Sequence, residues 1–228
     1  MAATITRFKN ILWQNENGEN KVPYTTENFP YPGLVKDAID NWWAKTRLNF
    51  LELNRSNIDS VESYLVFRYE TDPNSQSHTC LGHIRGKKIH EVVVNKNNKD
   101  ILRALLHEIG HSLGLLHEHQ RNRRDFFIRV NKDNWDKHRW PLEAFEQNVK
   151  NVYPSSLECT GISNQPNKFE YYDFESIMHY HQYSFGDGNH PTIEIKDRHN
   201  ADLFRDKMGT EAKLTNSDIV GVKNMYGI

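Results

Sequence analysis

The sequence has little cysteine and no long apolar run, and each shortage excludes a class of protein. Its 228 residues include two cysteines, Cys80 and Cys159, which allow at most one intramolecular disulfide. The longest apolar runs fall far below the roughly 20 residues of a membrane span, so we expect no membrane partner. A formal net charge of -1 gives no electrostatic reason to expect nucleic acid as a partner.

The chain also lacks a linker or an internal repeat that would divide it. With 37% hydrophobic and 11% aromatic residues there is ample material for a core, so we expect one domain over residues 1–228. The first 20 residues carry Arg7, Lys9, Glu16 and Glu19 and no apolar segment. A signal peptide is therefore expected to be absent from this chain. We also expect that the chain carries no propeptide and that it is a monomer.

The most informative stretch is His107-Glu108-Ile109-Gly110-His111-Ser112-Leu113-Gly114-Leu115-Leu116-His117. On a helix, with about 100° and 1.5 Å per residue, His107 and His111 lie on one face and can close on one metal ion. If the helix ran on, His117 would lie roughly 9 Å beyond His111, too far for a shared ion. Gly114 reaches the left-handed conformation that ends a helix, so the chain can return His117 to the metal.

Three neutral histidine nitrogens leave a coordination position for water, and zinc lowers the pKa of such a water to about 7. Glu108 adjoins the first ligand and is placed to act as general base. Chance would produce this whole pattern in about one such chain in ten thousand. The competing interpretation, a buried helix with satisfied polar residues, would bury three histidines and a glutamate at high cost. The stretch therefore predicts one catalytic Zn²⁺.

Periodicity predicts the elements around this motif. Strands are expected near 21–25, 63–69 and 91–95, with helices over about 34–46 and 100–113. Asp100 is the expected N-cap of the second helix. Trp42 and Trp43 are expected to face the core, and a helical stretch is expected between Trp135 and Val149.

Two segments carry a resemblance to a known family. His107 to His117, extended through Glu118-His119-Gln120-Arg121 and Arg124-Asp125, resembles the astacin family of zinc peptidases within the metzincins. Ser176-Ile177-Met178-His179-Tyr180 is similar to the Met-turn of that family. The resemblance implies an α+β zincin fold: a twisted, mostly parallel sheet with two long helices in an upper lobe of about residues 1–117, and an irregular lower lobe of about 118–228 with a C-terminal helix. The upper edge strand would hold extended substrate.

The resemblance also implies residue roles. Tyr180 would be a further zinc ligand that moves off the metal and stabilises the oxyanion, and Met178 would form a packed floor under the site. Glu118 resembles a buried glutamate that meets the N-terminus of the processed enzyme, whereas a local ion pair with Arg121 or Arg124 is the alternative. The short run Arg121, Arg123 and Arg124 is expected on a solvated or ion-paired surface.

The function implied is a secreted zinc endopeptidase that cleaves extracellular proteins or peptides, with Glu108 and Tyr180 as catalytic residues. The rival is an inactive, zinc-stabilised peptide-binding protein, against which the intact Glu108 argues. Only Cys80 and Cys159 are present, fewer than in animal members; one bridge between them fits an extracellular setting, and two free thiols are the alternative. Relatives often favour acidic residues after the cut, for which the candidate partners are Lys196, Arg198, Arg205 and Lys207.

Overall fold

One sheet forms the framework on which the histidine motif is mounted. The computed structural model describes residues 11–14, 17–121, 124–149 and 172–228. Among them, five strands form this sheet in the order β2-β1-β3-β5-β4. The strands are β1 (Lys21–Thr25), β2 (Asn49–Glu52), β3 (Tyr64–Glu70), β4 (His78–Thr79) and β5 (Ile89–Asn95).

The sheet is mostly parallel, as expected. β1 runs parallel to β2 and β3, and β3 runs parallel to β5, whereas β4 pairs antiparallel with β5 and forms the edge. The three predicted strands are present, with shifts of one or two residues at β3 and β5. β2 and β4 were not predicted, because strands of four and two residues are too short to display an alternating pattern.

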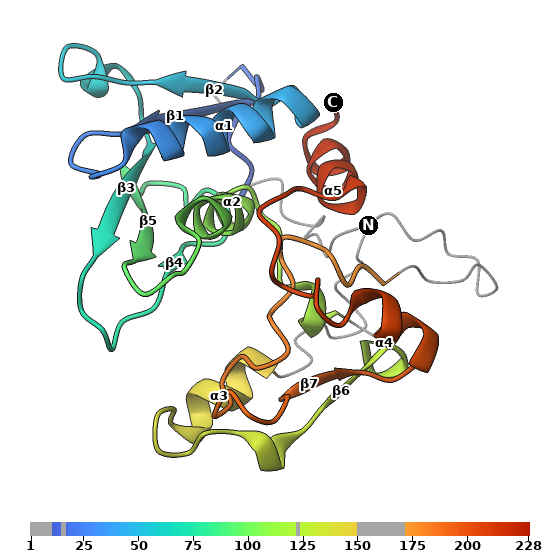
Figure 1. Ribbon diagram of the computed structural model, residues 1–228. Coiled ribbons are helices and arrows are strands. Elements are labelled where there is room, and N and C mark those ends of the chain that lie inside the picture. The colour runs from blue at the N-terminus through green and yellow to red at the C-terminus, as the bar shows by residue number, and fades with distance from the viewer. Residues whose placement is uncertain (1–10, 15–16, 122–123, 150–171) are drawn as a thin grey trace.

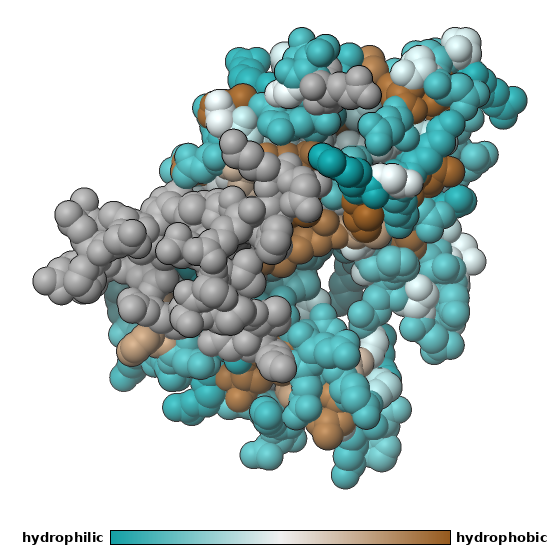
Figure 2. Space-filling model, turned by 180° about the vertical axis from the view of Figure 1, so that it is seen from behind, coloured by the Kyte–Doolittle hydropathy of each residue, from teal (hydrophilic) through white to brown (hydrophobic). Residues whose placement is uncertain are grey.

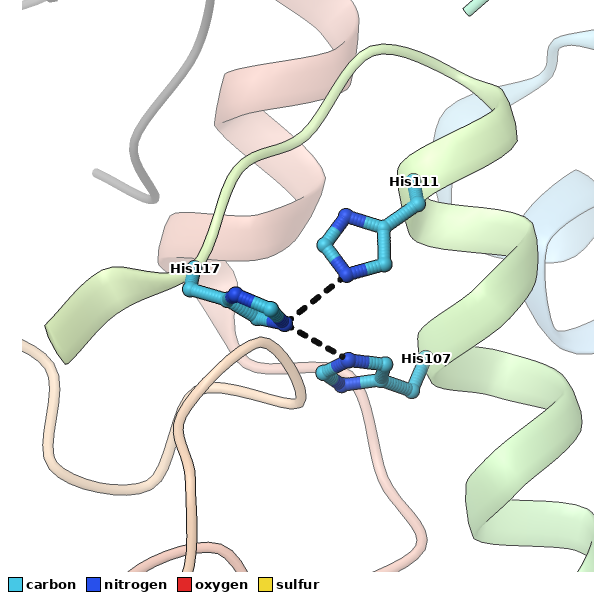
Figure 3. Close-up of side chains that lie close together, drawn as sticks. All are labelled: His107, His111 and His117. Atoms are coloured by element: carbon cyan, nitrogen blue, oxygen red, sulfur yellow. Dashed lines mark hydrogen bonds between the residues drawn. The ribbon is translucent and has the colours of Figure 1, made fainter. Parts of the chain in front are cut away.

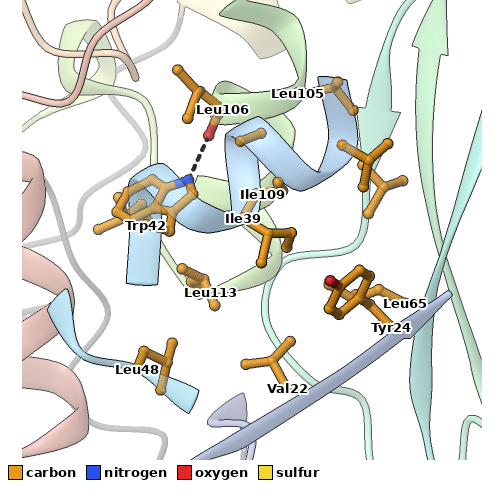
Figure 4. Packing of buried hydrophobic residues seen from close by; sticks show 14 of the residues in the cluster. Val22, Tyr24, Ile39, Trp42, Leu48, Leu65, Leu105, Leu106, Ile109 and Leu113 are labelled. Atoms are coloured by element: carbon orange, nitrogen blue, oxygen red, sulfur yellow. Dashed lines mark hydrogen bonds between the residues drawn. The ribbon is translucent and has the colours of Figure 1, made fainter. Parts of the chain in front are cut away.

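Two helices pack against each other and against the sheet (Figures 1 and 4). They are α1 (Pro32–Thr46) and α2 (Ile101–Ser112). Trp42 is fully buried between them, and its indole Nε1 donates to the Leu106 carbonyl at 3.2 Å. Trp43, expected to face the core, is 47% exposed. Successive residues of a helix point about 100° apart, so one apolar stripe does not bury both. Trp43 instead lies beside the Arg47 guanidinium.

Short elements make up most of the second half of the chain. β6 (Ile128–Val130) pairs antiparallel with β7 (Ile193–Ile195), near the helices α3 (Leu142–Val149) and α4 (Arg198–Phe204) (Figure 1). Single 3₁₀ turns are η2 (Ile58–Ser60), η3 (Glu118–Gln120), η4 (Arg124–Phe126) and η5 (Lys132–Asn134). The predicted helical stretch is confirmed only from Leu142 onward; Trp135 lies outside α3 and stacks on Phe145.

The C-terminal helix α5 (Asn216–Tyr226) returns to the sheet half of the molecule and contacts α1 (Figure 1). Val222 and Tyr226 belong to the same hydrophobic cluster as Trp42 and the α2 residues, and the Tyr226 hydroxyl donates to the Leu113 carbonyl at 3.2 Å. The main core therefore joins residues from both ends of the chain. The expected lower lobe keeps two smaller clusters, built around Ile193 and Phe145.

A cleft separates the sheet half from the second half. Its volume is about 600 Å³, and its lining combines β4, α2, α3 and the segment 179–185. Seen from behind in Figure 2, the surface is hollowed between the two halves. Within the part of the chain that the structure describes, none of the helices has the length and apolar character that a membrane span needs.

Candidate active site

The helix that carries the first two histidines begins and ends as its sequence predicts. At its start, the Asp100 side chain accepts a hydrogen bond from the Arg103 backbone N–H at 2.9 Å. The helix ends at Ser112, and Gly114 has φ of 105°. The backbone N–H of Gly114 donates to the His111 carbonyl and that of Leu115 donates to the Gly110 carbonyl, both at 2.9 Å. This pair of bonds is the Schellman motif, and it turns the chain back toward the helix.

The turn brings His117 to His107 and His111 (Figure 3). The Nε2 atom of His117 lies 3.2 Å from that of His107 and 2.9 Å from that of His111. Two ligands at about 2.05 Å in a tetrahedral zinc site would be separated by about 3.3 Å. Among the described residues, these three form the group whose ligand atoms all lie within 4.8 Å of one another. The spacing therefore suits one tetrahedral ion.

The other ring nitrogen of each histidine is held by a protein oxygen. Nδ1 of His107 donates to the Ile177 carbonyl at 2.7 Å, and Nδ1 of His111 donates to the Leu115 carbonyl at 2.8 Å. Nδ1 of His117 donates to the Gln120 side-chain oxygen at 3.0 Å. These bonds place the proton of each neutral ring on Nδ1, so three Nε2 lone pairs face one another. Lone pairs do not hydrogen-bond to one another, whereas a cation satisfies all three.

The electrostatics favour the neutral rings that a metal requires. Burial lowers the pKa of His111 to about 4, and burial followed by the neighbouring histidines lowers the pKa of His107 and His117 well below the ordinary value. A proton therefore competes poorly for this site near neutral pH. The donor set, three neutral imidazoles, is one that zinc prefers.

Glu108 is buried next to the first histidine. Its Oε2 atom is buried without a hydrogen-bond partner. Burial raises the pKa of Glu108 to about 8, while the nearby charge of Arg103 acts in the opposite direction. A cation bound by the histidines would act in the same direction as Arg103 and favour the carboxylate. Such an oxygen at the edge of the cleft is suited to accept a proton from water.

The segment 176–180 lies close to α2 at the two histidines, and the role of Met178 as a packed floor of the site remains a prediction. Met178 is fully buried beneath α2, and a Cβ added at Gly110 would lie 2.6 Å from its sulfur. Gly110 therefore allows the methionine to approach the helix between the two histidines. The sequence interpretation gave Gly110 no role, although a glycine inside a helical pattern is a signal of close packing.

Tyr180 lies against the triad but is held by another residue. Its ring is 4.4 Å from the ring of His117 and 4.1 Å from that of His119, between centroids. Its hydroxyl donates to the Asn148 side-chain oxygen on α3 at 2.9 Å. Asn148 lines the cleft and was not predicted as a site residue. Ligation of zinc by Tyr180 remains a prediction.

Glu118 is fully buried and forms an ion pair with Arg121 at 2.8 Å, which is one of the two alternatives for this residue. Its Oε1 atom also accepts from the Asp173 backbone N–H at 3.2 Å. The other alternative involves the N-terminus, which lies outside the described residues. Arg124 contacts Asp125 and the carbonyls of His119 and Val149.

Two of the three arginines in the run, Arg121 and Arg124, do not lie on a solvated surface. Arg121 and Arg124 are 2% and 7% exposed, and Arg123 lies outside the described residues. The expectation of a solvated surface is therefore wrong for Arg121 and Arg124, while ion pairing holds for both. The acidic partners Glu118 and Asp125 lie within three residues of these arginines in the chain, whereas the burial of the arginines depends on tertiary packing that the local sequence does not display.

Two further predictions concern residues away from the triad. Cys80 is half-buried, forms no disulfide with any residue that the structure describes, and accepts a hydrogen bond from Lys87 at 3.2 Å. Its expected partner, Cys159, lies outside the described residues, so the bridge remains a prediction. None of the four expected substrate-binding cations, at positions 196, 198, 205 and 207, lines the cleft; Arg103 and Arg139 do so instead.

The site combines three histidine nitrogens around one point, a buried carboxylate beside them and an edge strand along a cleft. This combination defines the class of zinc metalloendopeptidases. Comparison with known proteins assigns the family. The model of the peptidase family Astacin matches residues 8–227. The chain belongs to the astacin family.

Individual relatives are distant in sequence. Zinc metalloproteinase nas-14 of Caenorhabditis elegans is 28% identical over 99% of this chain, and human Tolloid-like protein 1 is 27% identical over 85%. The chain spans 39% and 17% of the lengths of these two relatives. High choriolytic enzyme 1, a hatching enzyme zinc-protease of Oryzias latipes, shares the fold with a TM-score of 0.71 and 20% identity, over 100% of this chain and 99% of that one.

Proposed function

We propose that this chain is a secreted endopeptidase that hydrolyses extracellular proteins or peptides, with Glu108 as general base and one zinc ion held by His107, His111 and His117. The observation that carries the proposal is the buried, unpartnered Oε2 atom of Glu108 beside three converging Nε2 atoms. Peptide hydrolysis needs a proton acceptor at this position, whereas a structural zinc site does not.

Glu108 and Tyr180 have different roles in the proposed reaction. When bound, zinc supplies a positive charge that polarises the substrate carbonyl and lowers the pKa of water. Glu108 removes a proton from the attacking water and passes it to the leaving amine. The Tyr180 hydroxyl exchanges its bond to Asn148 for one to the substrate oxygen as negative charge develops there.

An extended substrate would lie along β4. This strand is at the edge of the sheet, and His78 and Thr79 line the cleft. An exposed strand edge binds peptide by backbone pairing, which sets the position of the substrate backbone without selecting its side chains. Arg103 and Arg139 are positive groups in the same cleft, and we propose them as partners for acidic substrate side chains.

A cleavage assay with a matched variant tests the proposal. Zinc-loaded protein should cleave casein, lose that activity to a chelator and regain it when zinc is restored. Glu108→Gln keeps the size of the side chain and removes its basicity, so it should retain zinc and lose activity by about 10²–10⁴-fold.

Two results would contradict the proposal. Casein cleavage by Glu108→Gln at the wild-type rate would overturn Glu108 as the base. Peptide binding by the zinc-loaded wild type without any turnover would support the inactive binding protein instead.

A further inference from the structure

Three consecutive backbone carbonyls at 177–179 bind the segments that carry the metal ligands. The Ile177 carbonyl accepts from His107 Nδ1 at 2.7 Å. The Met178 carbonyl accepts from the backbone N–H of Glu118, the residue after His117, at 3.1 Å. The His179 carbonyl accepts from Arg103 on α2 at 3.1 Å. The conformation of this turn therefore sets the relative positions of α2 and the third histidine.

The turn is held from its other side by Asp218 on α5. Oδ1 of Asp218 accepts from the Ser176 hydroxyl at 2.6 Å, and Oδ2 accepts from the Ile177 backbone N–H at 3.1 Å. The Ser176 oxygen in turn accepts from the Met178 backbone N–H at 3.1 Å. Asp218 is fully buried, so water does not compete for the groups that make these hydrogen bonds.

The same carboxylate has a second function in the capping box of α5. Its Oδ2 atom accepts from the Thr215 backbone N–H at 2.9 Å, and the Asp218 backbone N–H donates to the Thr215 hydroxyl at 3.2 Å. A capping box needs an acidic or amide residue at this position to stabilise the helix start. It does not need that residue to be buried against a distant turn, so the contacts with Ser176 and Ile177 call for a separate explanation.

We propose that Asp218 is a positioning residue of the zinc site, which fixes Ser176 and Ile177 so that the Ile177 carbonyl holds the His107 ring with its Nε2 atom toward the metal. The proposal rests on the proposed function, in which the three histidines bind zinc. Residues that orient a metal ligand through its second nitrogen typically contribute a factor of about 10–100 in metal affinity. Asp218 acts one hydrogen bond further out, through the peptide backbone.

The test compares zinc affinity with helix stability. Asp218→Asn keeps the shape of the side chain but places an amide NH₂ where one of two acceptor oxygens stood, so its zinc dissociation constant should rise by about 10-fold. Ser176→Ala removes one of the two contacts with the turn and should raise the constant in the same direction by a smaller factor. Thr215→Ala weakens the cap of α5 and removes a hydroxyl that donates to Asp218 Oδ2 at 3.0 Å and to Asp173 Oδ2 at 2.6 Å, but it keeps the Asp218 carboxylate that accepts from Ser176 and Ile177. It should therefore lower the melting temperature with less than about a twofold change in zinc affinity.

Affinity is measured on the full chain by competition with a chromogenic chelator. If Asp218→Asn does not fold, the comparison of Ser176→Ala with Thr215→Ala decides the question. Unchanged zinc affinity in Ser176→Ala and in any folded Asp218→Asn would overturn the positioning role, as would an equal loss of affinity in Thr215→Ala. A wild type that binds zinc without cleaving peptides would contradict the proposed function alone, because the affinity comparison needs no turnover.

Discussion

At the scale of single residues, one hydrogen bond per histidine decides which nitrogen faces the ion. The three acceptors are the carbonyls of Ile177 and Leu115 and the side chain of Gln120. The acceptors of His111 and His117 lie four and three residues away in the chain, whereas the Ile177 carbonyl is 70 residues from His107 and no local pattern predicts it. Local spacing supplies the ligands and the acceptors of His111 and His117, and a tertiary contact supplies the orientation of His107.

Tyr180→Phe tests the proposed role of the phenol. The substitution removes the hydroxyl and keeps the ring that stacks on His119, so zinc content should be unchanged. Loss of one oxyanion donor should lower kcat by about 10²-fold with little change in KM, leaving measurable activity. Steady-state kinetics on a peptide substrate provide the measurement. Tyr183→Phe, on the same segment but outside the cleft lining, is the control and should keep wild-type kinetics. Equal kcat in the two variants would remove Tyr180 from the mechanism.

At the scale of elements, the residue at which α2 ends matters as much for the metal site as the length of the helix. Helix parameters predicted that α2 must stop before His117, and its last helical residue is Ser112. The predicted helices and long strands are present because their apolar residues recur at helical or alternating spacing. β2 and β4 are stabilised by their neighbours in the sheet, and such pairing leaves no local pattern in a short strand.

Gly114→Ala tests the helix stop. There is room for the added methyl group, because its nearest neighbour would be the Met225 sulfur at 3.4 Å. However, φ of 105° at this position is strained for any residue with a Cβ. We expect a loss of about 1–2 kcal/mol in unfolding free energy. Because His117 follows the turn, zinc affinity should fall as well.

The control is Gly33→Ala in α1, where a Cβ would meet nothing within 4 Å and φ is not positive. It should be neutral or stabilising by up to about 1 kcal/mol. The melting temperature and the zinc affinity of both variants are measured, by thermal unfolding and by competition with a chelator. A Gly114→Ala protein with wild-type melting temperature and zinc affinity would show that the turn does not need glycine.

At the scale of the whole molecule, the site depends on segments from both ends of the chain. Trp13 Nε1 donates to the Ser112 carbonyl at 2.7 Å, at the end of α2, and α5 supplies Asp218. The resemblance to the astacin family implied the zincin fold, and the helical spacing of the histidine motif predicted the metal ligands, because that motif is local in the chain. Asp218, Asn148 and Arg103 were missed as site residues, because each acts on a partner between 32 and 76 residues away.

Acid stability should report on a histidine pair near Trp13. His90 is buried, stacks on His83 and accepts from the Ile84 backbone N–H at 2.9 Å. Burial, followed by the charges of His83 and Lys87, lowers the pKa of His90 to about 4. Between about pH 6.5 and pH 4 the unfolded chain gains a proton at His90 that the folded chain does not, so unfolding free energy should fall as pH falls through this range.

The measurement is urea unfolding of the zinc-loaded protein at several pH values between neutral and mildly acidic. His90→Gln keeps an acceptor for Ile84 and does not titrate, so its stability should fall less steeply with acid than that of the wild type. The other buried histidines are present in both proteins and cancel in the difference. Parallel pH dependences in the two proteins would contradict the low pKa of His90.

The central claim is that three nitrogens, brought together by a helix and the turn that ends it, hold one metal ion. Elemental analysis of folded protein after zinc loading and dialysis tests it most directly. We expect one zinc per chain in the wild type and close to none in His111→Ala, with the fold retained by circular dichroism. A folded wild type that retains no zinc, or a His111→Ala variant that retains a full equivalent, would contradict the claim.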